Sequence, residues 1–190
     1  MASFEASAIA FPILVISSSL KGLWSLVDEP WKANPKPGKL DSILIGRFEP
    51  PKLPRGPGWT PGIAKKATEN GVETLPIFFN SKSAADVLSK FGKAKIISSN
   101  NLVADTDDLD DFIDGVNKIL DDDGIFFFET FYFYLQVKNF VWDFTYHEHY
   151  SYFLIRPLKE YFLKKGLEII EVKTNLTKGG SIRIVLQKKG

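Results

Sequence analysis

Both histidines of the chain lie in one tetrad, Tyr146-His147-Glu148-His149. An unperturbed imidazole exchanges protons near neutral pH, and here two of them stand beside a carboxylate and a phenol. Such a group of side chains suits general acid–base chemistry, in which a positioned residue takes a proton from a reacting atom or returns it. Asp143 lies just upstream, and aromatic residues are frequent on both sides. The tetrad is therefore the first candidate for a catalytic site.

The tetrad also allows two other interpretations. On a strand, His147 and His149 would share one face and could ligate a metal ion, yet no third ligand follows at short spacing. A structural or surface role also fits these residue types, because residue type alone gives only a probability of function. We expect no metal site, and we expect most aromatic residues between Phe126 and Phe153 to lie in the core.

The composition is that of an ordinary globular chain with one sizeable core. The chain has 190 residues, of which 44% are hydrophobic and 25% are charged. Its formal net charge of +1 gives no basic excess for binding nucleic acid or an anionic membrane. The absence of cysteine excludes disulfides, thiolate nucleophiles and cysteine-ligated zinc, and it is compatible with a reducing compartment.

The first 62 residues are irregular. The apolar run Ala8–Leu20 is too short to span a bilayer, and Glu5 stands where a secretion signal would carry lysine or arginine. We therefore expect a buried strand there and a cytoplasmic protein. Proline and glycine are dense in Pro30–Gly38 and Pro50–Pro61, which predicts loops around a short strand at Ser42–Gly46.

From Gly62 onward, helix and strand patterns alternate. We expect helices at Ile63–Glu69, Ser83–Phe91, Leu109–Leu120 and Arg156–Lys165, and strands at Thr74–Phe79, Ala94–Ser99, Ile125–Glu129, Leu167–Lys173 and Ser181–Lys188. The last two strands are joined by a turn that contains Gly179-Gly180, so they should pair antiparallel. The pattern predicts an α/β fold with a mostly parallel sheet and a C-terminal antiparallel hairpin at its edge.

Polar residues follow two of the expected strands. Asn100-Asn101 and Glu129 come where these strands end, and ligands of open α/β sheets bind outside the carboxyl ends of the strands. They should therefore face a binding crevice. Asparagine is also a common turn former, which is the alternative for the Asn pair. The acidic run Asp107–Asp111 is most simply the start of a helix with a solvated face.

Five short motifs connect the second part of the chain with a known family. They are Ser99-Asn100-Asn101-Leu102, Asp107-Asp108-Leu109, the run Asp123–Glu129, the run Asp143–Phe153, and Gly179-Gly180-Ser181-Ile182-Arg183. The run from Tyr146 to Phe153 is the most specific of them. With these motifs, Ile63–Gly190 resembles the C-terminal part of the S-adenosylmethionine-dependent sugar C-methyltransferases, which methylate a carbon next to the keto group of nucleotide-linked deoxysugars.

The resemblance implies a fold, a cofactor and a set of roles. Residues 63–190 would form a Rossmann-like methyltransferase domain, and the poorly matched residues 1–62 would leave its sheet incomplete at the N-terminus. S-adenosylmethionine would be the cofactor and a nucleotide-linked keto sugar the substrate. By resemblance, His149 is the general base with Tyr146 and Glu148 as active-site partners, Glu49, Asn100 and Asn101 contact the cofactor, and His147, Glu129 and Arg183 contact the substrate.

The chain departs from the family at several points. It lacks the cysteine-ligated zinc module with which the family begins, and it has no glycine-rich loop after the first strand, where Ile16–Gly22 is the nearest substitute. Asp105 and Lys178 stand where family members carry histidine. The alternative is therefore a catalytically inactive remnant that binds a sugar nucleotide or serves only as a structural module. The sequence leaves the oligomeric state open.

Overall fold

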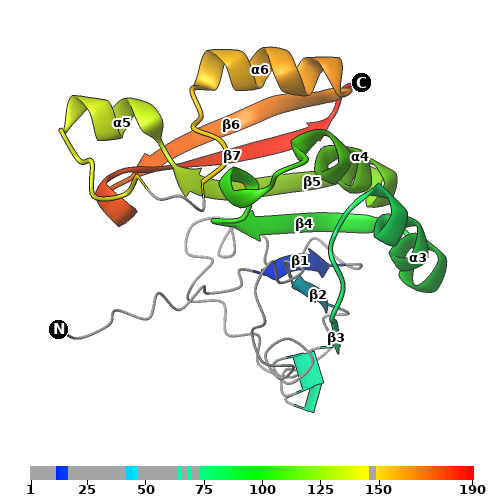
Figure 1. The fold of residues 1–190 in the computed structure, drawn as a ribbon. Helices are drawn as coiled ribbons and strands as arrows, with labels where there is room; N and C mark the ends of the chain where they lie inside the picture. Colours follow the sequence, from blue (N-terminus) through cyan, green and yellow to red (C-terminus); the bar gives the residue numbers. More distant parts are fainter. Residues whose placement is uncertain (1–11, 17–41, 47–63, 66–67, 70–72, 146–148) are drawn as a thin grey trace, which may run out of the picture.

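A computed structural model describes residues 12–16, 42–46, 64–65, 68–69, 73–145 and 149–190 (Figure 1). Its centre is a seven-stranded sheet with the order β3-β2-β1-β4-β5-β7-β6. The strands are β1 (Pro12–Ile16), β2 (Ser42–Gly46), β3 (Glu73–Leu75), β4 (Ala94–Asn100), β5 (Leu120–Phe131), β6 (Leu167–Asn175) and β7 (Ser181–Lys188). The helices are α3 (Ser81–Phe91), α4 (Leu109–Ile119), α5 (Phe133–Lys138) and α6 (Ile155–Lys164), with short 3-10 turns η2 (Val103–Asp105) and η3 (Thr177–Gly179).

Most strands of this sheet point in one direction. β2 pairs parallel with β3, and β4 pairs parallel with β5, whereas the other four neighbouring pairs are antiparallel. Followed across the sheet, β2 to β6 all run the same way, and β1 and β7 run against them. The expected α/β class, the parallel direction of the strands near Thr74, Ala94 and Ile125, and the C-terminal antiparallel hairpin are thus confirmed. The sequence patterns did not predict the reversal of β1.

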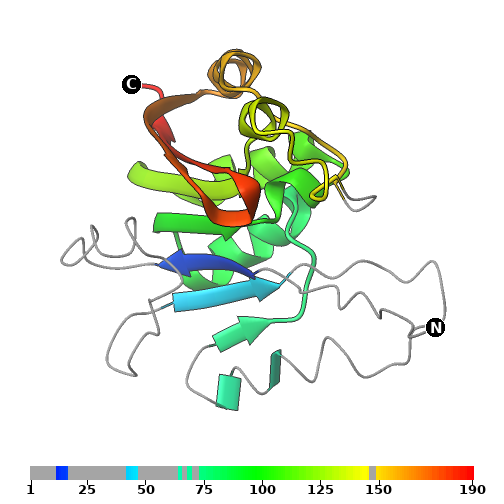
Figure 2. The ribbon, with the colours of Figure 1, turned by 90° about the vertical axis from the view of Figure 1, so that its left-hand side faces the viewer.

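The core lies where helices cover one face of β5 and its neighbours. Phe126 and Phe128 alternate with residues of the opposite face and are fully buried. The ring of Phe126 lies 6.4 Å from that of Phe112 on α4, and the ring of Phe128 lies 5.8 Å from that of Phe162 on α6. Burial of such large apolar rings is the main stabilising term for this layer. Figure 2 shows the strands of the sheet following one another from the β6–β7 hairpin to β3.

The element boundaries differ from the sequence expectations in a few places. Helix α3 starts two residues earlier than expected because Asn80 and Ser83 form a reciprocal capping box. The strand expected from Thr74 to Phe79 ends at Leu75. The short helix α5 was not expected. Of the helix expected at Ile63–Glu69, the four residues that the structure describes are helical, and the burial of the strand expected within Ala8–Leu20 lies outside the described residues.

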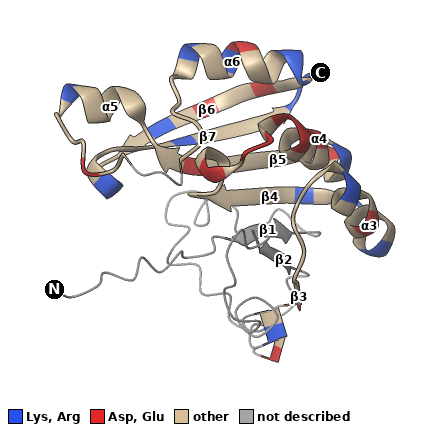
Figure 3. Cartoon of the chain, viewed as in Figure 1, with Lys and Arg blue, Asp and Glu red and all other residues tan. Residues whose placement is uncertain are grey.

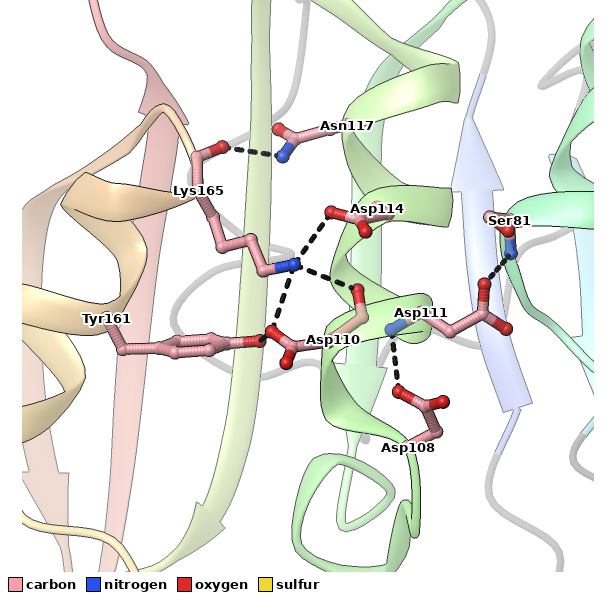
Figure 4. Close-up of polar contacts among 8 residues, drawn as sticks. All are labelled: Ser81, Asp108, Asp110, Asp111, Asp114, Asn117, Tyr161 and Lys165. Carbon is pink, nitrogen blue, oxygen red and sulfur yellow. Dashed lines mark hydrogen bonds and ion pairs between the residues drawn. The ribbon is translucent and has the colours of Figure 1, made fainter.

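A polar cluster joins α6 to α4 (Figure 4). The ammonium group of Lys165 lies 2.9 Å from Asp110 Oδ1 and 3.0 Å from Asp114 Oδ1. The Tyr161 hydroxyl donates to Asp110 Oδ1 at 3.1 Å, and the Asn117 amide donates to the Lys165 carbonyl at 2.8 Å. The acidic run Asp107–Asp111 does start a helix, as expected. Its side chains are not all solvated, because Asp110 contacts Lys165 and Tyr161 of the α6 region.

The described elements carry both acidic and basic side chains (Figure 3). Acidic side chains gather near the start of α4, and basic side chains lie on α3, α6 and the hairpin. At the amino end of β5, Lys95 bridges Asp121 and Asp123, and a side chain at Gly124 would meet the Ala94 carbonyl oxygen at 2.8 Å. Within the described residues, no helix is long and apolar enough to cross a membrane.

Candidate active site

The candidate site lies at the carboxyl ends of β4 and β5, which leave the sheet at the same edge. Asn100 is the register partner of Glu129 on β5. Asn101, directly after β4, has a φ of 51° and donates its backbone N–H to the Glu129 carbonyl oxygen at 2.7 Å. Asparagine tolerates this left-handed conformation better than most residues. The Asn pair therefore ends a strand and turns the chain, whereas its contact with a cofactor stays a prediction.

Backbone hydrogen bonds bring the chain after the tetrad to η2. The N–H groups of Tyr150 and Ser151 both donate to the Ala104 carbonyl oxygen, at 2.8 Å and 3.1 Å. As a result, the residues beside this anchor, Asp105 and His149, face each other. His149 Nε2 lies 3.7 Å from Asp105 Oδ1, and the two side chains are only 14% and 17% exposed.

Two aromatic rings hold the imidazole of His149. The ring of Phe131, at the end of β5, lies 4.1 Å from it between centroids, with an angle of 30° between the planes. The ring of Tyr152 meets it edge-on at 5.9 Å and also packs edge-on against Phe131 at 5.1 Å. Sequence reasoning placed His149 in the site but missed Asp105 as its neighbour. The one available signal was that Asp105 stands at a position where the family carries histidine.

Glu129 and Arg183 are brought together, but as partners of each other. They are register partners on β5 and β7, and the guanidinium donates from Nη2 and Nε to Glu129 Oε2 at 2.8 Å and 3.2 Å. Their side chains are 8% and 6% exposed. A paired carboxylate and guanidinium can stay charged inside the protein, where either charge alone would be costly. Substrate contact through these two residues stays a prediction.

Four of the expected site residues, Tyr146, His147, Glu148 and Glu49, lie outside the described residues. Within the part of the chain that the structure describes, no group of three or more potential ligands could hold a metal ion.

A shallow, largely apolar depression lies beside the site. It has a volume of about 250 Å³ and is lined by Leu109, Tyr152, Phe153, Leu154, Pro157, Leu158 and Tyr161. Tyr152 is the residue it shares with the surroundings of His149. Neither Asp105 nor His149 lines it, so we locate the candidate site by the polar groups at the strand ends and not by this depression.

The chain is similar to part of one known enzyme. The chain is 34% identical over 120 residues to the C-methyltransferase NovU of Streptomyces niveus, a match that covers 63% of this chain and 29% of that protein. This chain resembles part of a C-methyltransferase. It spans less than a third of that relative's length, and no model of a protein family matches it.

One solved methyltransferase structure supports the fold of this chain. The 1,6-didemethyltoxoflavin-N1-methyltransferase of Burkholderia thailandensis, solved with 1,6-didemethyltoxoflavin and S-adenosylhomocysteine, aligns with a TM-score of 0.50 and 12% identity over 78% of this chain and 61% of its own. A methyltransferase of Anabaena variabilis aligns with a TM-score of 0.47 and 13% identity over 65% and 62% of the two chains. The first of these likenesses supports the Rossmann-like methyltransferase fold of the chain.

The direction of β1 decides how well this methyltransferase fold fits a methyl donor. Ile13 pairs with Ser99 near the end of β4, whereas Ile16 pairs with Ile96 near its start. Ile16, the last residue of β1, therefore lies at the edge opposite to His149. Gly46, at the end of β2, lies at the site edge, because it pairs with Pro12. Gly46 and Asn100 therefore lie at the edge that carries His149, and β1 ends at the other edge.

Proposed function

We propose that this chain is the base-bearing part of an S-adenosylmethionine-dependent C-methyltransferase that acts on a nucleotide-linked keto-deoxysugar. The observation that carries the proposal is the placement of His149, which lies at the carboxyl edge of β5, stacked on Phe131 and facing Asp105. The similarity of the chain to part of a C-methyltransferase supports the class of reaction. The cytoplasmic location expected from the sequence belongs to this proposal.

The proposed chemistry needs a base because carbon is a poor nucleophile. The neutral imidazole of His149 takes the proton from the carbon beside the sugar's keto group, and the electron pair of that C–H bond passes into the enolate. Hydrogen-bond donors at the enolate oxygen would stabilise the charge that develops there, a role proposed for the Tyr146 hydroxyl. Glu148 would orient or polarise an imidazole. The low exposure of His149 limits the access of water to the basic nitrogen of its imidazole.

The remaining residues would bind the two small molecules. When bound, S-adenosylmethionine would supply a methyl group that the nucleophilic carbon can attack. Asn100, Asn101 and Glu49 would hold it at the strand ends, and His147, Glu129 and Arg183 would contact the sugar nucleotide. Because Glu129 and Arg183 are already paired, we expect them to shape the pocket wall while they remain bonded to each other.

A second candidate function has its own support. The reversal of β1 puts the end of that strand at the edge opposite to His149, so a protein with this arrangement could bind a sugar nucleotide and yet fail to place the methyl donor. This candidate is the inactive remnant, and it shares the base-bearing edge with the first.

Deuterium exchange tests the proposal without any need for methyl transfer. The protein is incubated in heavy water with a nucleoside diphosphate-linked 4-keto-6-deoxyhexose, and uptake of deuterium beside the keto group is followed by mass spectrometry. We expect uptake with the wild type and a loss of at least about a hundredfold in His149→Gln, as is typical when a general base is removed. His147→Gln is the matched control and should matter less. Equal uptake by the wild type and His149→Gln would exclude His149 as the base.

A further inference from the structure

We infer that Asp105 is a positioning residue, whose carboxylate holds Nε2 of His149 toward itself and stabilises the imidazolium that forms when His149 takes a proton. This inference rests on the proposed function for its catalytic meaning. Its structural content, the coupling of one carboxylate to one imidazole, can be tested without any substrate.

The backbone fixes the two residues as a pair. Ala104, directly before Asp105, accepts hydrogen bonds from Tyr150 and Ser151, which follow His149. The η2 turn is itself closed by the Asp105 N–H, which donates to the Leu102 carbonyl oxygen at 3.0 Å. Asp105 therefore cannot move away from His149 without breaking these contacts. Two segments far apart in the sequence are joined at the point where the imidazole needs an orienting group.

The ring orientation is also limited by packing. The Phe131 ring lies 4.1 Å from the imidazole with an angle of 30° between the planes, which restricts tilting of the imidazole, and Tyr152 meets it edge-on. Rotation within its own plane is left to polar contacts, of which the contact to Asp105 is one. At 3.7 Å this contact is longer than a hydrogen bond, and it becomes an ion pair only when the imidazole is protonated. Catalytic hydrogen bonds often shorten only when the substrate is bound.

Imidazole chemistry gives the inference a definite form. A neutral imidazole has one N–H donor and one acceptor nitrogen, and an ionised carboxylate only accepts. With Nε2 facing the carboxylate, Nε2 carries the proton and Nδ1 is the acceptor that takes the proton of the substrate. Nδ1 is buried in this structure, so this role requires the surrounding chain to move and expose Nδ1 when the substrate binds. Once both nitrogens are protonated, the positive charge lies beside Asp105, whose negative charge stabilises it.

Nitrogen NMR spectroscopy tests the coupling directly, because the chain has only two histidines and His147→Gln assigns their signals. In the wild type we expect the neutral ring of His149 to carry its proton on Nε2. In Asp105→Asn, which keeps the shape but removes the charge, the protonated ring should form only at lower pH than in the wild type. Asp105→Glu should restore much of the wild-type behaviour. Asp107→Asn changes an exposed carboxylate of the same segment and should leave the His149 signals unchanged.

Exchange kinetics provide the second readout. With the keto sugar nucleotide, the maximal exchange rate of Asp105→Asn should fall by roughly tenfold to a hundredfold, the loss expected for a misplaced catalytic group. The rising limb of its pH profile should move to lower pH, because the imidazole without its carboxylate becomes neutral at lower pH. A purely structural role would lower the rate without this shift.

The outcomes separate this inference from the proposed function. If the His149 signals are the same in the wild type and Asp105→Asn, or if the neutral ring carries its proton on Nδ1, the inference is wrong even when exchange depends on His149. If the NMR results are as expected but no exchange occurs in the wild type, the proposed function fails and the coupling of Asp105 to His149 stands. A variant that does not fold is replaced by Asp105→Ser, for which the same shift is expected.

Discussion

The two halves of the sheet differ in what they offer to chemistry. In the half formed by β4 to β7, parallel β4 and β5 end together, helices α4 and α6 pack on aromatic residues of β5, and His149 lies at the shared edge. In the half formed by β1 to β3, β1 runs against both of its neighbours. Removal of a proton and placement of a methyl donor are separate demands on the fold, and we expect this chain to meet the first better than the second.

The largest effect should come from breaking the buried ion pair between Glu129 and Arg183, on β5 and β7. Arg183→Met leaves the Glu129 carboxylate buried without its partner, so we expect the free energy of unfolding to fall by about 3 to 5 kcal/mol. Urea denaturation measures it. Lys173→Met, which changes a more exposed cation on the neighbouring strand, is the matched control. The double variant Glu129→Leu with Arg183→Met should regain much of the loss. Equal effects of Arg183→Met and Lys173→Met would contradict the pairing.

The half of the sheet formed by β1 to β3 should weaken the affinity for the cofactor. Because the end of β1 lies at the wrong edge, we expect S-adenosylmethionine to bind roughly a hundredfold more weakly than to a methyltransferase with a complete loop, which corresponds to about 2.7 kcal/mol. Calorimetric titration measures the affinity. Glu49→Ala should weaken it further, since Glu49 is among the remaining proposed contacts. Tight binding that is insensitive to Glu49→Ala would show that the cofactor site lies elsewhere.

A smaller effect should come from the glycine turn that packs on α5. Gly180 has a φ of +127°, and a side-chain carbon there would lie 2.7 Å from Leu135 Cβ. We expect Gly180→Ala to destabilise the protein by about 2 to 3 kcal/mol, through strain and steric overlap together. Gly92→Ala isolates the strain, because Gly92 also has a positive φ but open space around it, and about 1 kcal/mol is expected. Thermal unfolding of both variants compares them, and equal losses would contradict the close contact with α5.

The smallest effect should come from the polar cluster between α4 and α6. Lys165 chiefly, and Tyr161 next, hold the pKa of Asp110 below its usual value, and Asp110 in turn raises the pKa of Lys165. The contribution of Asp110 is therefore complete above about pH 4 and is lost as the pH falls, whereas that of Lys165 is complete below about pH 10 and is lost as the pH rises.

The variant that tests this polar cluster is Lys165→Met. At pH 7 it should lower the Tm by about 1 to 3 °C, and the difference from the wild type should shrink toward about pH 3. Lys164→Met, at an exposed neighbouring position of α6, should have no such pH-dependent effect. A difference that stays constant from pH 7 to pH 3 would exclude Asp110 as the partner that matters.

Much of the fold followed from the sequence because local patterns determine it. The apolar runs at β4 and β5, the glycines after α3 and α6, and the Gly179-Gly180 turn predicted these elements and the hairpin. Strand direction is different, since an apolar run of five residues such as β1 reads the same in either orientation. Helix α5 has only six residues within an aromatic run, so no clear period marks it.

The site was predictable only in part, for a physical reason. Residue types marked His149, and strand ends marked Asn100 and Glu129. Contacts between distant segments left no local trace. The approach of Asp105 to His149 depends on two hydrogen bonds to Ala104, and the pairing of Glu129 with Arg183 depends on the register of β5 and β7. Neither can be read from one stretch of sequence.

We expect His149 to remove the proton beside the keto group although the methyl donor is poorly placed. Mass spectrometry of the sugar nucleotide after incubation with the protein and S-adenosylmethionine in heavy water tests it in one measurement. We predict that the sugar gains deuterium beside its keto group much faster than it gains a methyl group, and that His149→Gln abolishes both. Methyl transfer as fast as exchange would contradict the account of β1, and a bound sugar that gains neither label would contradict the account of His149.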